Sequence, residues 1–398
     1  MNAGIAGNRG DSVRSDCYVK CTIGSVGGWE IEVESKVEAM YGASIRNLAE
    51  QILSYYEIEH AHMVIEDKGA LPFVLAARLE CAIKKVTAVE KPFLLPLINE
   101  SLQRSTVDRY RRSRLYLPGN NPKIMLNAGL HGADGIILDL EDSVAPQKKF
   151  EARFLVRNAL RHVNFGEAER MVRINQIPEG LDDLPYVIPY GVDLVLIPKC
   201  ENADQIVQVN ESICELLQVK ESPIFLMPII ESAKGILNAY DIASAATNIV
   251  AIAIGLEDYS ADIGAQRTVE GKESFYARSV VVNASRAAGI QPIDSVFSDV
   301  AKVGQLRKTA LESRGLGFVG MGCIHPRQIG VINECYSPTV EELERAQKIV
   351  DAYNIALEKG EGVVSIGSKM IDPPIVKRAL NVIRNADVLS KNRRNNHG

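Results

Sequence analysis

The sequence predicts an α/β protein built on a (β/α)8 TIM barrel, with a small α+β domain before the barrel and a helical segment after it. Two observations carry this prediction. From residue 114 onward, short apolar runs alternate with helical segments, which is the pattern of strand and helix units around a parallel sheet. Eight such runs fall within about 215 residues, the size expected of one closed barrel.

Bulk composition limits the classes of function. The 398 residues are 46% hydrophobic and 24% charged, as in an ordinary globular chain of two or three domains. The net charge of -5 arises from well-mixed acidic and basic residues, without the one-signed patch that favours nucleic acid or an anionic membrane. We therefore expect a small-molecule partner, with no nucleic acid and no membrane.

Location and redox state follow from simple patterns. No apolar run approaches the roughly 20 residues that cross a bilayer, and the first ten residues lack a signal pattern, so we expect a cytoplasmic chain. The seven cysteines are scattered, with no CxxC pair and no histidine at zinc spacing. They are expected to be reduced thiols.

The first 98 residues have the texture of a separate domain. The alternating segments "DCYVKCTI" and "WEIEVES", separated by "GSVGG", predict a hairpin. An amphipathic helix at "SIRNLAEQILSYYEI", an apolar segment at "AHMVIED" and a second helix at "PFVLAARLECAIKKV" complete the domain. The polar stretch 99–113 is expected to be a linker, 114–335 the barrel and 336–398 a C-terminal helical part.

The eight apolar runs of the barrel lie at intervals that leave room for one crossover helix each. This spacing favours a closed barrel over an open doubly wound sheet. In order, the runs are "RLYLPG", "GIILDLED", "RMVRINQ", "VDLVLIPK", "IFLMPIIES", "IVAIAIGLED", "QPIDSVF" and "FVGMGCIHP".

Polar side chains gather at the C-terminal ends of these runs, whereas the strand starts show nothing comparable. In such barrels the loops that follow the strands converge on one mouth, where the chemistry takes place. The residues are Asp139, Glu141 and Asp142 after the second run, Arg173 and Asn175 after the third, Lys199 after the fourth, Glu231 after the fifth, Glu257 and Asp258 after the sixth, Asp294 after the seventh and His325 after the eighth. The sequence therefore predicts a polar pocket at the mouth.

Two of these acids are candidate metal ligands. Glu231 and Asp258 come from adjacent predicted strands, so their carboxylates can converge on one hard cation. Mg2+ suits this arrangement because it keeps several waters and takes only one or two protein carboxylates. The alternative is that each acid pairs with a neighbouring lysine or arginine.

Four basic residues have competing interpretations. Arg173 ends an apolar strand, where its buried guanidinium needs an anionic partner. The three alternatives for this partner are a substrate carboxylate, an enolate oxygen and the acidic residues at the mouth. Lys199 at an acidic mouth would have a raised pKa, which favours a positioning role over a Schiff base. Lys123 in "PGNNPK" suits a phosphate only weakly, and a turn is the alternative. His325, before a proline, reads as a hydrogen-bonded structural histidine.

Seven motifs stand in the order seen in citrate lyase beta subunits, and the chain resembles that family over roughly residues 110 to 385. They are "RSRLYLPGNNP", "ILDLEDSVAPQKK", "MVRINQ", "IPKCE", "PIIESAKGI", "GLEDYSADIG" and "CIHPRQI". The resemblance extends to malyl-, citramalyl- and citryl-thioester lyases. It implies a barrel with a C-terminal lid in a homotrimer or a multiple of it, with Mg2+ held by Glu231 and Asp258.

The resemblance also implies a reaction. The expected enzyme is a Mg2+-dependent carbon-carbon lyase that cleaves a citryl-type 3-hydroxyacyl thioester to oxaloacetate and an acetyl thioester. One alternative is a malyl-CoA or citramalyl-CoA lyase that uses free CoA thioesters. Another is a non-catalytic scaffold subunit. The expected partners are an acyl-CoA or acyl-carrier thioester and an acyl transferase subunit.

Individual roles follow from the same resemblance. Arg173 would stabilise the thioester enolate, and Asp372 in "SKMIDPP" would be the base supplied by the lid across a subunit interface. On the residues alone, the role of Asp372 as a cap for the helix that follows is favoured over a catalytic role, and the resemblance reverses this preference. Asp139, Glu141 and Asp142 would surround the metal waters, with Glu141 first among them, and substrate contacts are expected from Arg112, Lys123 and Lys199.

The N-terminal part resembles the citrate lyase acyl carrier subunit in "GASIRNLAEQIL" and in "DKGAL" followed by "ARLE". Such carriers attach a phosphoribosyl-dephospho-CoA arm to a serine in a motif close to Glu-Ser-Ser/Gly-Asp. The corresponding stretch is "VRSD", with Arg14 at the serine position and Ser12 and Ser15 nearby in a changed context. We therefore expect no prosthetic-group attachment and an acyl-carrier-like domain that serves in packing or docking.

Overall fold

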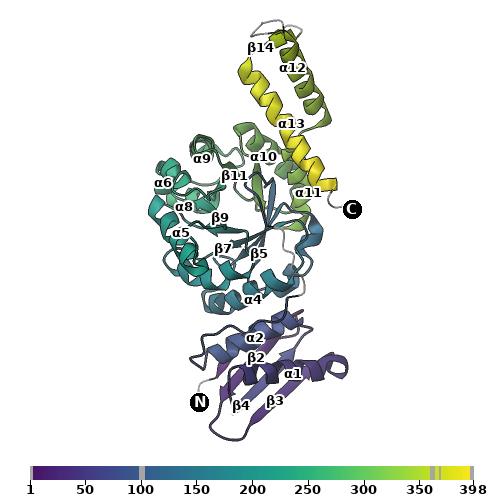
Figure 1. The fold of residues 1–398 in the computed structure, drawn as a ribbon, viewed down its shortest axis with the longest axis vertical. Coiled ribbons are helices and arrows are strands. Elements are labelled where there is room, and N and C mark those ends of the chain that lie inside the picture. Colours follow the sequence, from purple (N-terminus) through teal and green to yellow (C-terminus); the bar gives the residue numbers. More distant parts are fainter. Residues whose placement is uncertain (1–2, 98–103, 359–363, 367–368, 395–398) are drawn as a thin grey trace.

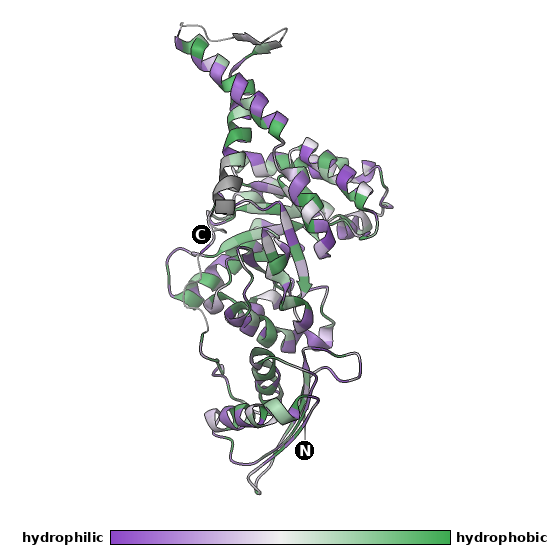
Figure 2. Cartoon of the chain, turned by 90° about the vertical axis from the view of Figure 1, so that its right-hand side faces the viewer, coloured by the Kyte–Doolittle hydropathy of each residue, from purple (hydrophilic) through white to green (hydrophobic). Residues whose placement is uncertain are grey.

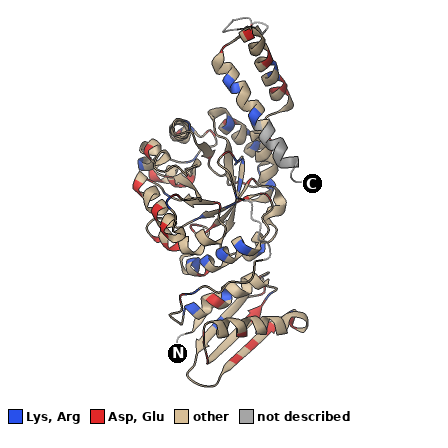
Figure 3. Ribbon diagram, viewed as in Figure 1, with Lys and Arg blue, Asp and Glu red and all other residues tan. Residues whose placement is uncertain are grey.

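The computed structural model describes residues 3–97, 104–358, 364–366 and 369–394. Three parts follow one another along the chain: a small α+β domain, a closed barrel and a C-terminal helical hairpin that projects from the barrel (Figure 1). Acidic and basic residues both occur in all three parts (Figure 3). None of the described helices is both long and apolar enough to cross a membrane.

The N-terminal domain is a four-stranded sheet with both helices packed on one face. Its elements are β1 (Gly4–Gly7), β2 (Cys17–Ile23), β3 (Trp29–Ser35), α1 (Glu38–Tyr55), β4 (Ala61–Asp67) and α2 (Pro72–Lys84), and the strand order is β1-β2-β4-β3. Alternate residues of β2 and β4 are buried because only one face of the sheet is covered.

The predicted hairpin between β2 and β3 is wrong. β4 lies between these strands, antiparallel to β2 and parallel to β3 over the full length of both. Helix α1 makes the crossover that joins β3 to its parallel neighbour β4. The glycine-rich segment after β2 is therefore a loop rather than a hairpin turn.

All eight predicted runs form strands of one closed parallel barrel, which confirms the fold class. The strands are β5 (Ser113–Pro118), β6 (Gly135–Asp139), β7 (Glu169–Arg173), β8 (Leu194–Ile197), β9 (Phe225–Ile230), β10 (Ala251–Ile254), β11 (Gln291–Asp294) and β12 (Gly320–Cys323). Inward-facing apolar residues such as Ile137, Met171, Leu196 and Met227 fill the barrel, as inward residues do in this fold.

Helices join the strands and cover the outside of the barrel (Figure 1). They are α3 (Pro122–Met125), α4 (Lys149–His162), α5 (Ala203–Leu217), α6 (Ala233–Leu237), α7 (Ala239–Ala243), α8 (Leu256–Asp262), α9 (Phe275–Ala287), α10 (Val303–Leu316) and α11 (Pro326–Tyr336). Local sequence fixes several ends: Asn202 forms a capping box at α5, and Gly317 adopts the left-handed conformation that ends α10.

The N-terminal domain is fixed on the flank of the barrel by helix α2, which packs against α4 (Figure 1). Every residue of α2 from Phe73 to Ile83 is buried, because the helix lies between its own sheet and the barrel (Figure 2). Arg157 of α4 forms a buried ion pair with Glu80, and the Gly7 amide donates to Glu151 Oε2 at 3.1 Å. Breaking such buried ionic contacts is strongly unfavourable in free energy. The N-terminal domain is therefore packed against the barrel rather than joined to it only by a linker.

The C-terminal part is a helical hairpin with a small two-stranded sheet at its tip. Its elements are α12 (Val340–Glu358), β13 (Val364–Ile366), β14 (Lys369–Ile371) and α13 (Pro373–Arg394). The predicted helix leading away from the barrel is present as α12, and the strand pair at the turn was not predicted. Apolar side chains of this hairpin, including Ile355, Leu357, Met370 and Leu380, are exposed.

Candidate active site

A cavity of about 380 Å3 opens at the mouth of the barrel, at the carboxyl ends of the strands. Its walls come from strands on all sides of the barrel and from the loops that follow them. Among the residues that line it are Arg114, Tyr116, Asp139, Asp142, Ser143, Arg173, Glu231, Glu257, Asp258, Asp294 and Ser295. The structure therefore brings together most of the predicted ring of polar side chains.

Arg173, the last residue of β7, is held by Asp139, the last residue of the adjacent β6. The Nε–Oδ1 and Nη2–Oδ2 distances are both 2.7 Å, which makes a bidentate pair. Burial alone would lower the pKa of Arg173, but the hydrogen bond and charge of Asp139 outweigh burial and raise it. The acidic residues at the mouth, one of the three kinds of anion considered for Arg173, therefore contact its guanidinium.

Glu141 links Arg173 to Lys199. Its Oε2 lies 2.8 Å from Arg173 Nη1, and its Oε1 lies 3.4 Å from Lys199 Nζ. Burial raises the pKa of Glu141, and the charge of Asp142 adds to this effect, whereas Arg173 opposes it. Asp142 is half-exposed and lies 3.7 Å from both cations.

The charges around Lys199 favour the positioning role that the sequence predicted for it. Burial alone would lower its pKa, but the charges of Glu141, Asp142 and Asp258 outweigh burial and raise it. An amine kept protonated in this way is a poor nucleophile for a Schiff base. Its backbone adopts the left-handed conformation, with φ of 47°, and its amide donates to Glu231 Oε2 at 3.0 Å.

Glu231 follows β9 directly and is only 7% exposed. Burial raises the pKa of this carboxyl to about 7, and the negative charges of Glu141 and Asp258 add to the effect. Gly255 leaves room for it, because a Cβ at that position would lie 2.2 Å from Glu231 Oε1. This close approach explains why the loop after β10 begins with glycine.

The acids of "GLEDYSADIG" separate on the short helix α8. Asp258 lines the mouth cavity near Glu231 and Lys199. Glu257 also borders the cavity, but it is exposed and pairs with Arg267, while the exposed Asp262 accepts from the Ala233 amide at 2.8 Å. Among the residues that the structure describes, Asp258 has no ion-pair partner, so the segment contributes one such carboxylate to the predicted metal site.

The charges at the mouth fit a divalent cation. Glu257 and Asp294 pair with Arg267 and Arg278. Among the other described residues at the mouth, three cations, Arg114, Arg173 and Lys199, stand against five carboxylates, those of Asp139, Glu141, Asp142, Glu231 and Asp258. The excess negative charge around the buried Glu231 is the environment that a bound cation neutralises. The oxygen-only donor set of Glu231 and Asp258 is the kind that Mg2+ prefers.

Tyr116 and Ser295 belong to the site although the sequence analysis did not select them. The guanidinium of Arg173 stacks over the Tyr116 ring at 5.3 Å from its centroid. Ser295 Oγ accepts from the Leu256 amide at 3.1 Å and so positions the start of α8. The alternation in "SRLYLP" places Arg114 and Tyr116 on the inward face of β5, which is a signal that could have identified both residues.

Other predicted site residues have structural partners. Arg112 lies before β5, at the opposite end of the strand from the mouth, where it pairs with Asp134 at 2.8 Å and donates to Ser337. This placement takes Arg112 out of the candidate site, because its guanidinium secures the strand start to a neighbouring loop and the segment after α11. Asn175 donates to Asp183 at 2.8 Å.

His325 and Lys123 stand at helix starts. His325 caps α11, accepting from the Arg327 amide at 3.1 Å, as expected of a structural histidine. Lys123 is exposed on α3, after β5 and therefore on the mouth side of the barrel. It is not among the residues that line the cavity.

Asp372 caps helix α13, since its Oδ1 accepts from the Ile375 amide at 3.1 Å. It lies between β14 and α13, in the C-terminal hairpin that extends away from the barrel (Figure 1). Among the described residues of this chain, Asp372 does not line the mouth cavity.

Arg14 lies in the exposed loop before β2, where its Nη1 donates to the carbonyls of Asp11 and Val13. Ser12 is exposed, and Ser15 is partly buried with a left-handed backbone. Asp16 at the end of this loop is buried against Arg78 of α2, with an Nε–Oδ1 distance of 3.0 Å. The Asp16–Arg78 ion pair therefore fixes the C-terminal end of this loop to α2.

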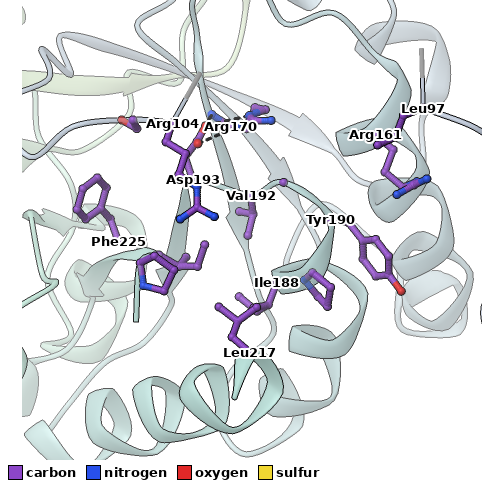
Figure 4. A pocket seen from close by; sticks show the side chains of 15 residues that line it. Leu97, Arg104, Arg161, Arg170, Ile188, Tyr190, Val192, Asp193, Leu217 and Phe225 are labelled. Carbon is purple, nitrogen blue, oxygen red and sulfur yellow. Dashed lines mark hydrogen bonds and ion pairs between the residues drawn. The ribbon is translucent and has the colours of Figure 1, made fainter. Parts of the chain in front are cut away.

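A second cavity, of about 340 Å3, lies at the other end of the barrel, near the starts of β7, β8 and β9 (Figure 4). Arg170 and Asp193 pair with each other there, and apolar residues such as Ile188, Val192 and Phe225 form much of the wall. It offers Asp193 as its only acid among the described residues, and that acid is already neutralised. The acid-rich mouth is therefore the better candidate for metal chemistry.

Two family models match the chain. Residues 112–326 match the one described as HpcH/HpaI aldolase/citrate lyase. Residues 6–86 match an acyl carrier model described as malonate decarboxylase delta subunit (MdcD). The second match supports the acyl-carrier-like nature of the N-terminal domain.

Named relatives are similar to about 70% of the chain. Citrate lyase subunit beta of Leuconostoc mesenteroides subsp. cremoris is 39% identical over 286 residues, which is 70% of this chain and 94% of that protein. Human mitochondrial citramalyl-CoA lyase is 32% identical over 287 residues, covering 69% of this chain and 84% of that protein. The solved structure of protein CitE from Mycobacterium tuberculosis, in complex with magnesium, acetoacetate and coenzyme A, is 28% identical with a TM-score of 0.58, covering 70% of this chain and 98% of that one.

Proposed function

Because the chain belongs to the HpcH/HpaI aldolase/citrate lyase family, we propose that it is a Mg2+-dependent carbon-carbon lyase. Its proposed substrate is a citryl-type 3-hydroxyacyl thioester, and its products are oxaloacetate and an acetyl thioester. The observation that carries the proposal is the buried carboxylate of Glu231 beside Asp258, in the same cavity as Arg173. Relatives named as citrate lyase subunit beta and citramalyl-CoA lyase support the reaction class.

Glu231 and Asp258 would hold the metal, which the related CitE structure contains together with coenzyme A. When bound, Mg2+ supplies a Lewis acid that lowers the pKa of a nearby hydroxyl and polarises a developing carbonyl. The amide of Lys199 orients the Glu231 carboxylate, and Glu141 and Asp142 face the same region. These groups would set the position of the metal waters.

Arg173 would stabilise the thioester enolate. Each terminal nitrogen of a guanidinium carries two hydrogens, so Nη2 keeps a donor beside its hydrogen bond to Asp139, and Nη1, which is ion-paired with Glu141, can also donate to a substrate oxygen. The bidentate contact with Asp139 and the ring of Tyr116 hold the guanidinium before substrate binds. A preorganised donor of this kind stabilises charge that develops in the transition state.

The cleavage itself is a retro-Claisen step. A base removes the proton of the C3 hydroxyl, the C2–C3 bond breaks, and its electron pair moves to the thioester as an enolate. Protonation of the enolate at C2 then gives the acetyl thioester, and the C3 fragment leaves as oxaloacetate. We assign the base to Asp372 of a neighbouring subunit, because the C-terminal hairpin projects from its own barrel and exposes apolar side chains for docking.

The N-terminal domain would act in packing or docking rather than as a covalent carrier. Arg14 has no hydroxyl to esterify, and the buried contacts of α2 with α4 anchor the domain. The substrate would then be a diffusible acyl-CoA. In the alternative arrangement, a separate carrier subunit delivers the substrate as an acyl-carrier thioester. An acyl transferase subunit is then a further partner, and this chain serves only as the lyase component.

A malyl-CoA or citramalyl-CoA lyase is the second candidate function. Arg14 favours it, because a chain without a carrier arm suits free CoA thioesters, and so does the 32% identity to human citramalyl-CoA lyase. A non-catalytic scaffold is disfavoured by the clustered charges of Glu231, Asp258 and Arg173, which packing alone does not require.

The proposal is tested by incubating the purified chain with citryl-CoA and Mg2+ and coupling oxaloacetate release to NADH oxidation. Turnover that depends on Mg2+ and is abolished by Glu231→Ala is expected. Parallel reactions with citramalyl-CoA and malyl-CoA, followed through pyruvate and glyoxylate, rank the two candidate functions by kcat/KM. No turnover of any of the three thioesters would contradict both.

A further inference from the structure

Arg114 is a buried cation on the floor of the mouth cavity. It is 1% exposed and points inward from β5 into the barrel, among apolar residues such as Met227 and Ile293. Its Nη1 lies 3.1 Å from Met227 Sδ, and its Nη2 lies 3.5 Å from the Asp294 carbonyl oxygen. Its Nε has no hydrogen-bond partner among the described residues.

Other buried arginines of the chain have carboxylate partners. The pairs are Arg78 with Asp16, Arg111 with Glu169, Arg157 with Glu80, Arg170 with Asp193 and Arg278 with Asp294. Within the described part of the chain, Arg114 has no carboxylate within 4.0 Å. An isolated buried charge is unfavourable for folding, so an unpaired guanidinium at this place calls for a ligand.

Two glycines stand beside this side chain on the neighbouring strands. In the barrel register, Arg114 stands beside Gly135 of β6 and Gly322 of β12. A Cβ at Gly135 would lie 2.6 Å from Met171 Cε and 3.4 Å from Arg114 Cγ, and a Cβ at Gly322 would lie 2.6 Å from Val296 Cγ1, so larger residues at these positions would crowd the interior around the arginine. Two glycines thus flank the arginine, and its guanidinium borders the same cavity as Glu231, Asp258 and Arg173.

We propose that Arg114 binds the distal carboxylate of the substrate and thereby selects thioesters whose keto-acid product is a dicarboxylate. This inference rests on the proposed function and names its substrate class. In a citryl thioester, the C3 hydroxyl and C3 carboxylate are the groups that a metal held by Glu231 and Asp258 would bind, and the thioester oxygen is the group assigned to Arg173. The CH2–COO⁻ arm on C3 is the one anionic group left over, and it becomes the second carboxylate of oxaloacetate.

The competing substrates lack this group. A citramalyl thioester carries a methyl group in place of the arm and releases pyruvate, and a malyl thioester carries hydrogen and releases glyoxylate. Either would leave the buried guanidinium without a counter-charge. A site built to bond a polar group strongly rejects analogues that lack it, because its own buried group is then left unpaired.

The test compares Arg114→Met, which keeps the length of the side chain and removes the charge, with the unaltered protein. For citryl-CoA we expect kcat/KM to fall at least about a hundredfold, whereas kcat/KM for citramalyl-CoA changes less than about threefold or rises. Arg114→Lys, which keeps the charge but not the two-pronged geometry, should fall between the two. The melting temperature of Arg114→Met should equal or exceed that of the unaltered protein, since no ion pair is broken.

Binding of the free products gives an independent measurement. By calorimetry in Mg2+, oxaloacetate should bind more tightly than pyruvate, and Arg114→Met should abolish this preference. Equal losses for citryl-CoA and citramalyl-CoA, or an unchanged preference for oxaloacetate in Arg114→Met, would overturn the inference. Failure of the unaltered protein to cleave any thioester would contradict the proposed function instead, and the product-binding comparison would still decide the role of Arg114.

Discussion

Asp139 and Arg173 end adjacent parallel strands and form a bidentate ion pair at the mouth of the barrel, with both N–O distances at 2.7 Å. The backbone amides of Glu141 and Ser143 also donate to Asp139, so its carboxylate is fixed from both sides. A rigid guanidinium beside a cluster of acids is the element on which the proposed enolate stabilisation depends. The pair therefore links the stability of the barrel mouth to its chemistry.

Asp139→Asn should weaken both folding and activity. The change keeps the shape of the side chain but leaves Arg173 without its main partner, and breaking a buried pair costs about 3 kcal/mol. We expect a matching drop in the free energy of unfolding, measured with urea, and a loss of kcat of at least about tenfold. Glu257→Gln, at an exposed ion pair, is the control and should change stability by less than about 1 kcal/mol.

The same pair gives a direction for pH dependence. Burial alone would raise the pKa of Asp139, but Arg173 outweighs burial and lowers it. A carboxyl with a lowered folded-state pKa stabilises the protein above its unfolded pKa of about 4 and loses this contribution as the pH falls further. The stability difference between the unaltered protein and Asp139→Asn should therefore be full at pH 7 and shrink below about pH 4. A difference that is the same at pH 3 and pH 7 would contradict the assignment.

Thiol titration should distinguish one cysteine from the other six. All seven are free, and Cys214 is partly exposed whereas the others are buried. Burial raises the pKa of Cys21 to about 11 and that of Cys81 to about 12, so these thiols stay protonated and unreactive at pH 8. We expect one fast-reacting thiol in the folded protein and seven after denaturation. Fast reaction in a Cys214→Ser protein would contradict this picture.

The N-terminal domain should remain unmodified in the presence of the enzyme that charges acyl carriers. Arg14 occupies the position of the modified serine, and the loop is pinned by the Asp16–Arg78 pair. Co-expression with a phosphoribosyl-dephospho-CoA transferase, followed by intact mass spectrometry, should show the unaltered mass. An added mass localised to Ser12 or Ser15 would restore the swinging-arm interpretation.

Subunit complementation tests the assignment of Asp372. Within its own chain this residue caps α13 in the projecting hairpin. If it completes a neighbour's site, mixing Asp372→Ala with Arg173→Ala should restore part of the activity, because mixed oligomers contain an intact composite site. Inactive mixtures, with subunit exchange verified by mass spectrometry, would restrict Asp372 to its capping role.

The barrel and most of its polar mouth could be predicted because their signals are local. Each apolar run specifies its own strand, and the parallel arrangement places every strand end at the same edge, so Asp139, Arg173 and Glu231 converge without further information. Strand pairing in the N-terminal domain was mispredicted for the opposite reason. Whether β2 pairs with β3 or with β4 depends on the crossover helix between β3 and β4. The turn residues between β2 and β3 give no information about that crossover.

The partners of individual side chains are the second feature that could not be predicted from the sequence. Arg112 and Arg114 are two residues apart in one motif, but Asp134 neutralises Arg112 at the start of the strand, whereas Arg114 faces the barrel interior without a carboxylate among the described residues. Similarly, Glu257 and Asp258 are adjacent in the sequence but point in different directions from α8. Glu257 forms an exposed ion pair with Arg267, whereas Asp258 lies near Glu231. Such differences depend on which face of an element meets which neighbour.

The central claim, a Mg2+ site built on Glu231 and Asp258, is tested most directly by a crystal structure of the protein soaked with Mn2+. Mn2+ takes the same oxygen ligands as Mg2+ and is located by its anomalous signal. The account predicts one strong anomalous peak at the barrel mouth, within about 2.3 Å of both carboxylates, and its loss in Glu231→Gln. A cavity without such a peak at millimolar Mn2+, or a peak bound to neither Glu231 nor Asp258, would contradict it.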